Sequence, residues 1–295
     1  MRRIVAGAVT AAALSCAAPA AAQDYGGGRL PFSVPIRPFT PTTGITLQVR
    51  GDRMAFRFDT SLQCPGYRYE IVGRRVVAFD GRHFAAKAKG SFRIGTRRGN
   101  RVTYRWRLRG QADGTIASGR LFVTGTRYLD GRRQKCGAKP RRRFSARVAG
   151  PAPVGSPVPP AKAAYGGLSD VDVGRGLRGH VLLKVGGSSK RIGSRWSVFA
   201  TCGRGPRDSL TNITPPMRLR ADGSFSRSER FSAGYVGLFI RYRVRFAGRV
   251  SGEFANGTLR MRSRIYTANG KRLLTRCDSG LRSWSASMLR PISPG

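Results

Sequence analysis

Rows of arginine are the residues of this chain whose type and spacing could do chemistry. In the segments 101–109 and 240–246 apolar residues alternate with positions that are mostly arginine. A guanidinium is permanently charged and donates hydrogen bonds to phosphate, sulfate or carboxylate, so a row of them along a strand would attract a polyanion. We expect the binding surface to contain Arg105, Arg107, Arg109, Arg141, Arg142, Arg143, Arg241, Arg243, Arg245, Arg260 and Arg262.

The overall charge points to the same class of partner. The 295 residues include 55 Lys and Arg against 14 Asp and Glu, which gives a net charge of +41. Such a chain attracts anionic envelope polymers, acidic polysaccharides or nucleic acid without sequence specificity. A second explanation stays open, because a high-GC genome also writes arginine at ordinary solvated positions, and the basic residues here are 47 Arg and 8 Lys.

Catalytic groups are sparse. His83 follows an Asp-Gly turn, and we expect it to be exposed; His180 is expected at the surface, where a strand begins. Folding could bring together a carboxylate pair of the glycosidase kind from Asp59, Glu70 or Asp80, although their spacing does not indicate one. We therefore expect a binding or structural protein without catalytic activity or cofactor. The alternative is a secreted hydrolase of an envelope polymer or polysaccharide.

The elements that position the arginines are predicted to be strands. An apolar period of two, rich in aromatic and β-branched residues, is typical of half-buried antiparallel strands. This pattern turns the aromatic residues of 101–109 toward the core and the arginines outward. Asp130-Gly131 and Asn269-Gly270 are strong hairpin turns. The fold class is therefore all-β, with seven or eight short strands per unit in a sandwich or a small barrel.

The chain contains an internal repeat of one unit. The segment 110–121 matches 248–259 without a gap, and Lys89–Phe92 resembles Asp222–Phe225. Tyr25-Gly26-Gly27 recurs at Tyr165-Gly166-Gly167. We name the units copy 1 (25–149) and copy 2 (165–290). The stretch 150–164 between them is rich in Pro, Ala and Gly, which indicates an extended linker.

Cysteines support this division. Cys64, Cys136, Cys202 and Cys277 give each copy one early and one late cysteine. An even number in an exported chain predicts disulfides, and the simplest pairing within each copy is Cys64–Cys136 and Cys202–Cys277. No CxxC pair or nearby histidine completes a zinc site, so we expect no metal.

The first residues predict export. Residues 1–22 contain two arginines, a short apolar stretch and a small-residue end, as a signal peptide does. We expect the mature protein to be secreted or extracytoplasmic, without a transmembrane helix. In a minor alternative, Cys16 is lipidated and anchors the protein to the outer face of the membrane.

Copy 2 opens with Tyr-x-Gly at Tyr165 and continues with Cys202, a late Cys-x-x-Gly at Cys277 and an aromatic-x-Ala at Trp284. On these motifs each copy resembles an uncharacterised exported β-domain of high-GC actinobacteria that carries two cysteines, and copy 2 carries the pattern best. In copy 1 the late motif departs from this pattern, with Lys139 in place of glycine. The resemblance implies export, paired cysteines and an all-β fold, and it implies no activity.

Overall fold

The computed structural model describes residues 23–29, 43–95, 97–137, 141–148, 159–171, 178–203, 208–235 and 237–289. The predicted signal peptide, Cys16 and most of the predicted linker lie outside these ranges. The described residues contain no helix long and apolar enough to span a bilayer.

The all-β prediction is confirmed, and each copy forms one nine-stranded antiparallel sheet. Copy 1 contains β1 (Gln23–Arg29), β2 (Thr43–Arg50), β3 (Arg53–Cys64), β4 (Tyr67–Ala78), β5 (His83–Arg93), β6 (Arg101–Asp113), β7 (Ile116–Leu129), β8 (Arg132–Cys136) and β9 (Arg141–Val148). Copy 2 contains β10 (Ala164–Val171), β11 (Arg178–Val185), β12 (Arg191–Cys202), β13 (Asp208–Arg218), β14 (Ser224–Tyr235), β15 (Leu238–Ser251), β16 (Phe254–Thr267), β17 (Leu273–Asp278) and β18 (Arg282–Met288).

Nine strands per copy exceed the expected seven or eight. The short strand β8, with the sequence RRQKC, shows why sequence undercounts them. It has no apolar alternation, and it pairs with β7 alone. A strand of this kind cannot be identified from its own residues, and only its pairing with a neighbouring strand reveals it.

The copy 2 sheet closes into a barrel and the copy 1 sheet curls into an incompletely closed one, a choice that the sequence left open. In copy 2, β17 pairs with both β12 and β16, so pairing runs in a ring through β10, β11, β12, β17, β16 and β18. In copy 1, β8 pairs with β7 and reaches β3 by one hydrogen bond, from Gly137 N–H to the Gln63 carbonyl oxygen at 2.7 Å. The predicted disulfides Cys64–Cys136 and Cys202–Cys277 are both present and join the same strands.

Aromatic side chains fill both barrels, as the alternation predicts. In copy 1, Trp106 meets Phe58 edge to face at a centroid distance of 5.1 Å. In copy 2, Trp284 stacks on Phe246 at 5.3 Å. Both opening tyrosines make the same contact, since the hydroxyls of Tyr25 and Tyr165 each donate to a turn glycine carbonyl at 2.7 Å. Burial of large rings is a main source of the stability of each unit.

The strand register changes one match between the copies. Phe225 opposes Gly248 in copy 2, and Phe84 opposes the corresponding Gly110 in copy 1. Phe84, which follows the turn at Asp80, is therefore the counterpart of Phe225. The strand register therefore contradicts the sequence match of Lys89–Phe92 with Asp222–Phe225, which rested on the Gly-Ser-Phe triplet that both segments share.

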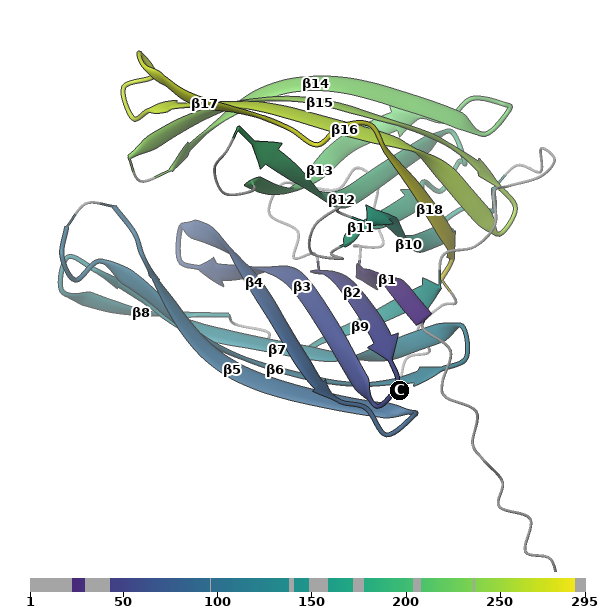
Figure 1. Ribbon diagram of the computed structural model, residues 1–295, viewed down its shortest axis with the longest axis horizontal. Helices are drawn as coiled ribbons and strands as arrows, with labels where there is room; N and C mark the ends of the chain where they lie inside the picture. The colour runs from purple at the N-terminus through teal and green to yellow at the C-terminus, as the bar shows by residue number, and fades with distance from the viewer. Residues whose placement is uncertain are drawn as a thin grey trace, which may run out of the picture.

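The copies pack together along β1, β2 and β9 of copy 1 and β10, β11 and β18 of copy 2, as Figure 1 shows. The backbones come close enough that a Cβ on Gly26 would collide with the carbonyl oxygen of Gly167. Arg147 also donates to the Met288 carbonyl oxygen at 2.7 Å. This junction covers outer strand faces that a single copy would expose to water.

Candidate functional site

A cationic hollow lies on the outer face of β5, β6, β7 and β8 in copy 1. Its volume is about 1000 Å³. Because successive side chains of a strand point to opposite faces, the residues of β6 that turn outward are the arginines predicted from sequence. None of the residues that line the hollow is acidic. Five of them are basic: Lys89, Arg105, Arg107, Arg133 and Lys135.

Pairing between strands brings these cations together. Lys89 on β5 lies directly opposite Arg105 on β6. Lys135 on β8 lies opposite Thr126 on β7, which in turn lies opposite Thr103 on β6. All five basic side chains are exposed. Groups of one charge held on a rigid sheet gain most from an anion that neutralises several of them at once.

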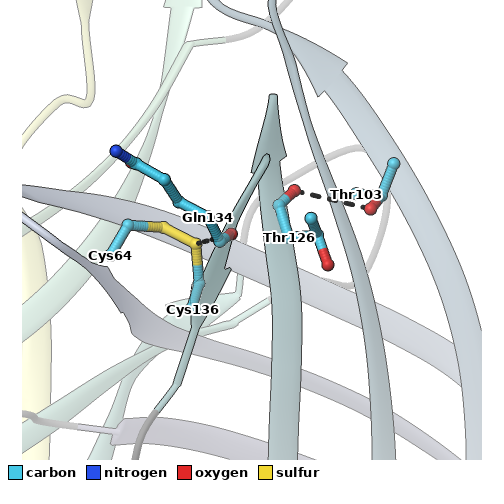
Figure 2. Close-up of a disulfide and its surroundings, with 5 residues drawn as sticks. All are labelled: Cys64, Thr103, Thr126, Gln134 and Cys136. Atoms are coloured by element: carbon cyan, nitrogen blue, oxygen red, sulfur yellow. Dashed lines mark hydrogen bonds between the residues drawn. A yellow bond between two sulfur atoms is a disulfide. The ribbon is translucent and has the colours of Figure 1, made fainter. Parts of the chain in front are cut away.

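The floor of the hollow is less polar than its rim. Phe122 is half-buried opposite Arg107, and Thr124 lies opposite Arg105. The hydroxyl of Thr103 donates to the Thr126 carbonyl oxygen at 3.4 Å, beside the disulfide that holds β8 in place (Figure 2). The floor is therefore fixed by backbone pairing and the disulfide.

Copy 2 has the equivalent hollow, and it is much smaller. Arg243, Arg245, Arg260 and Arg262 line a volume of about 120 Å³. Arg243 lies directly opposite Arg262, and Arg245 opposite Arg260, so like charges face each other across β15 and β16. Such pairs repel unless a counter-charge lies between them.

Asp278 supplies that counter-charge. Its carboxylate accepts from Arg260 Nη2 at 2.7 Å, from Arg260 Nε at 3.2 Å and from Arg262 Nε at 2.9 Å. Burial acts to raise the pKa of Asp278, but hydrogen bonds from Arg260, the Gly280 N–H and Arg262 outweigh it and lower the pKa to about 2. In copy 1 the residue after the late cysteine is Gly137, so no carboxylate stands there.

Three of the remaining predicted arginines, Arg109, Arg143 and Arg241, do not line either hollow. Arg109 and Arg241 are exposed on their strands, and Arg241 stacks on Tyr266 with 5.2 Å between its guanidinium carbon and the ring centroid. Arg143 is half-buried on β9. Arg141 and Arg142 lie on the same strand, and their side chains are outside the described part of the structure.

The predicted site residues did not include the lining residues Lys89, Phe122, Arg133 and Lys135. Each is the outward residue of a strand beside β6 or β7. A prediction of which strands are neighbours would have found them, because antiparallel register then places each opposite a known residue.

The two histidines differ in whether the structure exposes them as the sequence predicts. His83 is exposed beside Asp80, as expected. The expectation for His180 is wrong, because its side chain is 1% exposed and lies inside the junction. Its ring lies against the backbone of Gly44 in β2, where any side chain would overlap it. The outer face of β11 is covered by copy 1, and that contact cannot be read from copy 2 alone.

His180 belongs to a buried charge cluster. Its Nδ1 lies 3.1 Å from a carboxylate oxygen of Asp59, which is fully buried. Arg195 of copy 2 pairs with the other oxygen of the same carboxylate. Arg57 lies 3.6 Å from the oxygen that His180 contacts. Arg195 also reaches Glu70 at 3.5 Å, at the rim of the junction. Two of the acids considered for a carboxylate pair, Asp59 and Glu70, thus meet at one arginine.

Burial and charge move these pKa values apart. Burial acts to raise the pKa of Asp59, but His180 and the two arginines outweigh it and hold that pKa far below its usual range. Burial lowers the pKa of His180. Burial, and then the charge of Asp59, raise the pKa of Glu70. The Asp59 side chain has no exposed surface, and its contacts with His180 and Arg195 link copy 1 to copy 2.

Comparison with known proteins adds little. No protein-family model matches the chain, and no curated protein matches it. A solved structure of kievitone hydratase from Nectria haematococca aligns with 90% of this chain and 89% of the hydratase chain, at 7% sequence identity and a TM-score of 0.19. A TM-score that low supports neither a shared fold nor a shared activity.

Proposed function

We propose that the protein binds polyanions, and that the cationic hollow of copy 1 is the binding site. The observation that carries this proposal is the set of five exposed basic side chains around one hollow without an acidic lining residue. An anionic polymer crossing β5 to β8 would place several charged groups within reach of them. The binding is of the non-specific kind, since nothing in the hollow reads a sequence.

The setting supports an extracytoplasmic polymer as the ligand. Two disulfides indicate that the protein folds in an oxidising compartment. An exported protein of this charge meets the acidic polymers of the cell envelope before it meets nucleic acid. Export, and the absence of catalysis, remain predictions from the sequence.

Reversing two charges in the hollow is expected to weaken binding strongly. In Arg105→Glu with Arg107→Glu, two contacts to the polymer are lost, each worth on the order of tenfold in affinity at ~0.1 M salt. Titration of labelled heparin against each protein measures the affinity, and the logarithmic salt dependence should become shallower for the variant. Arg53→Glu with Arg82→Glu, two exposed residues at turns of copy 1, makes the same change in net charge.

The two variants separate a site from general attraction. If the protein is only a diffuse positive surface, both double variants will lose the same affinity. Equal losses would contradict a site in the hollow. If labelled heparin does not bind the wild-type protein at low salt, polyanion binding is contradicted altogether.

Removing the internal carboxylate of copy 2 is expected to open a second site. Asp278→Asn frees Arg260 and Arg262 from their bound counter-charge. Isothermal titration with a short heparin fragment should then show two bound fragments per chain in place of one. Asp52→Asn removes the same charge from an exposed turn and should leave one. An unchanged stoichiometry for Asp278→Asn would show that the arginines of copy 2 do not bind such a ligand.

A further inference from the structure

A buried arginine lies inside the copy 1 barrel, on the face of β7 opposite to the hollow. Arg127 is 3% exposed. It shares the inner face of β7 with Leu121 and Val123, and it lies directly opposite Val102 on β6 and Gln134 on β8. An arginine at a core position is rare unless a charged or polar partner holds it.

The guanidinium of Arg127 has donors to spare. Its Nε and Nη1 atoms are buried, and within the described chain neither has a hydrogen-bond acceptor. The side-chain oxygen of the neighbouring Gln134 is buried and unpaired in the same way. Among the described residues, two other arginines are buried, Arg57 and Arg195, and they share the carboxylate of Asp59. Unpaired buried donors cost stability, so a group that accepts from Arg127 would be bound favourably.

One aromatic ring lies over this guanidinium and begins a chain of ring contacts. The Tyr67 ring centroid lies 4.2 Å from its central carbon, and Tyr67 stacks on Tyr69 at 6.4 Å. Phe92 meets Tyr69 at 5.6 Å and Tyr104 at 6.2 Å. Tyr67 is paired with Cys64, whose side chain points inward, and yet it is 57% exposed. Rings that face the inside of a barrel and still touch solvent mark an open end of that barrel.

The fold itself does not require Arg127. In copy 2 the corresponding residue, opposite Ile240 on β15 and Thr275 on β17, is Ile265. It packs on the copy 2 core as an ordinary apolar residue. The arginine is therefore a feature of copy 1 alone, in a position that an apolar side chain occupies in copy 2.

We propose that the open end of the copy 1 barrel binds a small aromatic anion, with its carboxylate, sulfate or phosphate group on Arg127. The planar guanidinium fits such a group with paired hydrogen bonds, and the rings of Tyr67 and Tyr69 stack against the flat part of the ligand. The Gln134 side chain is placed to bind a further polar group of the ligand. A polymer does not fit this role, because Arg127 lies inside the barrel and the hollow lies outside.

The probe for this site is 1-anilinonaphthalene-8-sulfonate, an aromatic sulfonate whose fluorescence rises on burial. Folded wild-type protein is expected to bind one molecule per chain. Arg127→Ile, which copies the residue of copy 2, should weaken binding by about tenfold or more through loss of the paired charge-assisted bonds. Arg82→Gln removes the same charge from the exposed turn between β4 and β5 and should bind the probe as wild type does.

A second variant, which keeps the positive charge, tests the proposal in case Arg127→Ile does not fold. Arg127→Lys retains the cation but not the planar fork, so it should bind the probe more weakly than wild type. Near-ultraviolet circular dichroism reports whether each variant keeps its packed core. The proposal fails if a folded Arg127 variant binds the probe like wild type, or if Arg82→Gln loses as much affinity as Arg127→Ile.

Discussion

The free energy of unfolding of Asp59→Asn is expected to fall by about 3–5 kcal/mol, because the change leaves Arg195 and Arg57 buried without their shared counter-charge. The asparagine keeps the shape of the side chain, so the loss reports charge and not packing. Guanidinium chloride titration followed by tryptophan fluorescence measures it, since Trp106 lies in copy 1 and Trp196 in copy 2.

The matched control for Asp59 is Asp52→Asn. Asp52 is exposed at the turn between β2 and β3, and its replacement should change stability by no more than a few tenths of a kcal/mol. Equal effects of the two changes would show that the buried cluster does not hold the copies together.

The same cluster gives the pH dependence a definite sign. Because the pKa of His180 is lowered by burial, the unfolded chain takes up a proton first as pH falls below about 6.5, and stability falls. Asp59 adds a loss below about pH 4, since its folded pKa is also lowered. Glu70 acts in the opposite direction, because its raised pKa makes stability fall as pH rises above about 4.5. Glu70→Gln should therefore steepen the loss of stability on acidification.

Removal of either disulfide is expected to cost about 4 kcal/mol, because the closed loops are similar, with sequence separations of 72 and 75. The functional effects should differ. In copy 1, β8 is held to β3 by the Cys64–Cys136 bond and one backbone hydrogen bond. In copy 2, β17 is also paired with β12. Loss of the first disulfide therefore leaves β8, with Arg133 and Lys135, held by its pairing with β7 and less firmly fixed beside the hollow.

The paired variants Cys64→Ser with Cys136→Ser, and Cys202→Ser with Cys277→Ser, test this difference. Both should unfold at lower denaturant concentration by similar amounts. Heparin affinity, measured below the unfolding transition, should fall only in the first. If the second variant loses affinity to the same extent, the binding site is not the hollow bordered by β8.

Sequence alone predicts the strands of this fold well where one face is core and the other is water. In β6 the alternation of Val102, Trp106 and Leu108 with arginine gives both the strand and its orientation. The disulfide pairing follows from the repeat for a similar reason, because each copy must close on its own. Local pattern is sufficient in both cases.

The junction could not be predicted in this way. Arg57 and Asp59 alternate with Phe56 and Phe58, so the pattern marks them as outward residues, which is correct for copy 1 alone. Outward does not mean solvated here, because copy 2 covers that face with His180. Burial between two units depends on how they dock, and a periodicity within one strand contains no information about docking.

Arg127 is a different case, since the sequence contained a signal. In β7 the alternation set by Leu121 and Val123 continues through Gly125 to Arg127, which assigns the arginine to the core side. A charged residue on the apolar phase of a strand breaks the pattern. Such breaks are places where a site is to be sought.

Arginine footprinting tests the central claim most directly. Phenylglyoxal modifies exposed guanidinium groups, and mass spectrometry of peptides measures the extent at each arginine with and without heparin. Binding in the copy 1 hollow predicts that heparin protects Arg105, Arg107 and Arg133 and leaves Arg53 and Arg243 reactive. Protection spread evenly over both copies, or confined to copy 2, would contradict the assignment of the site.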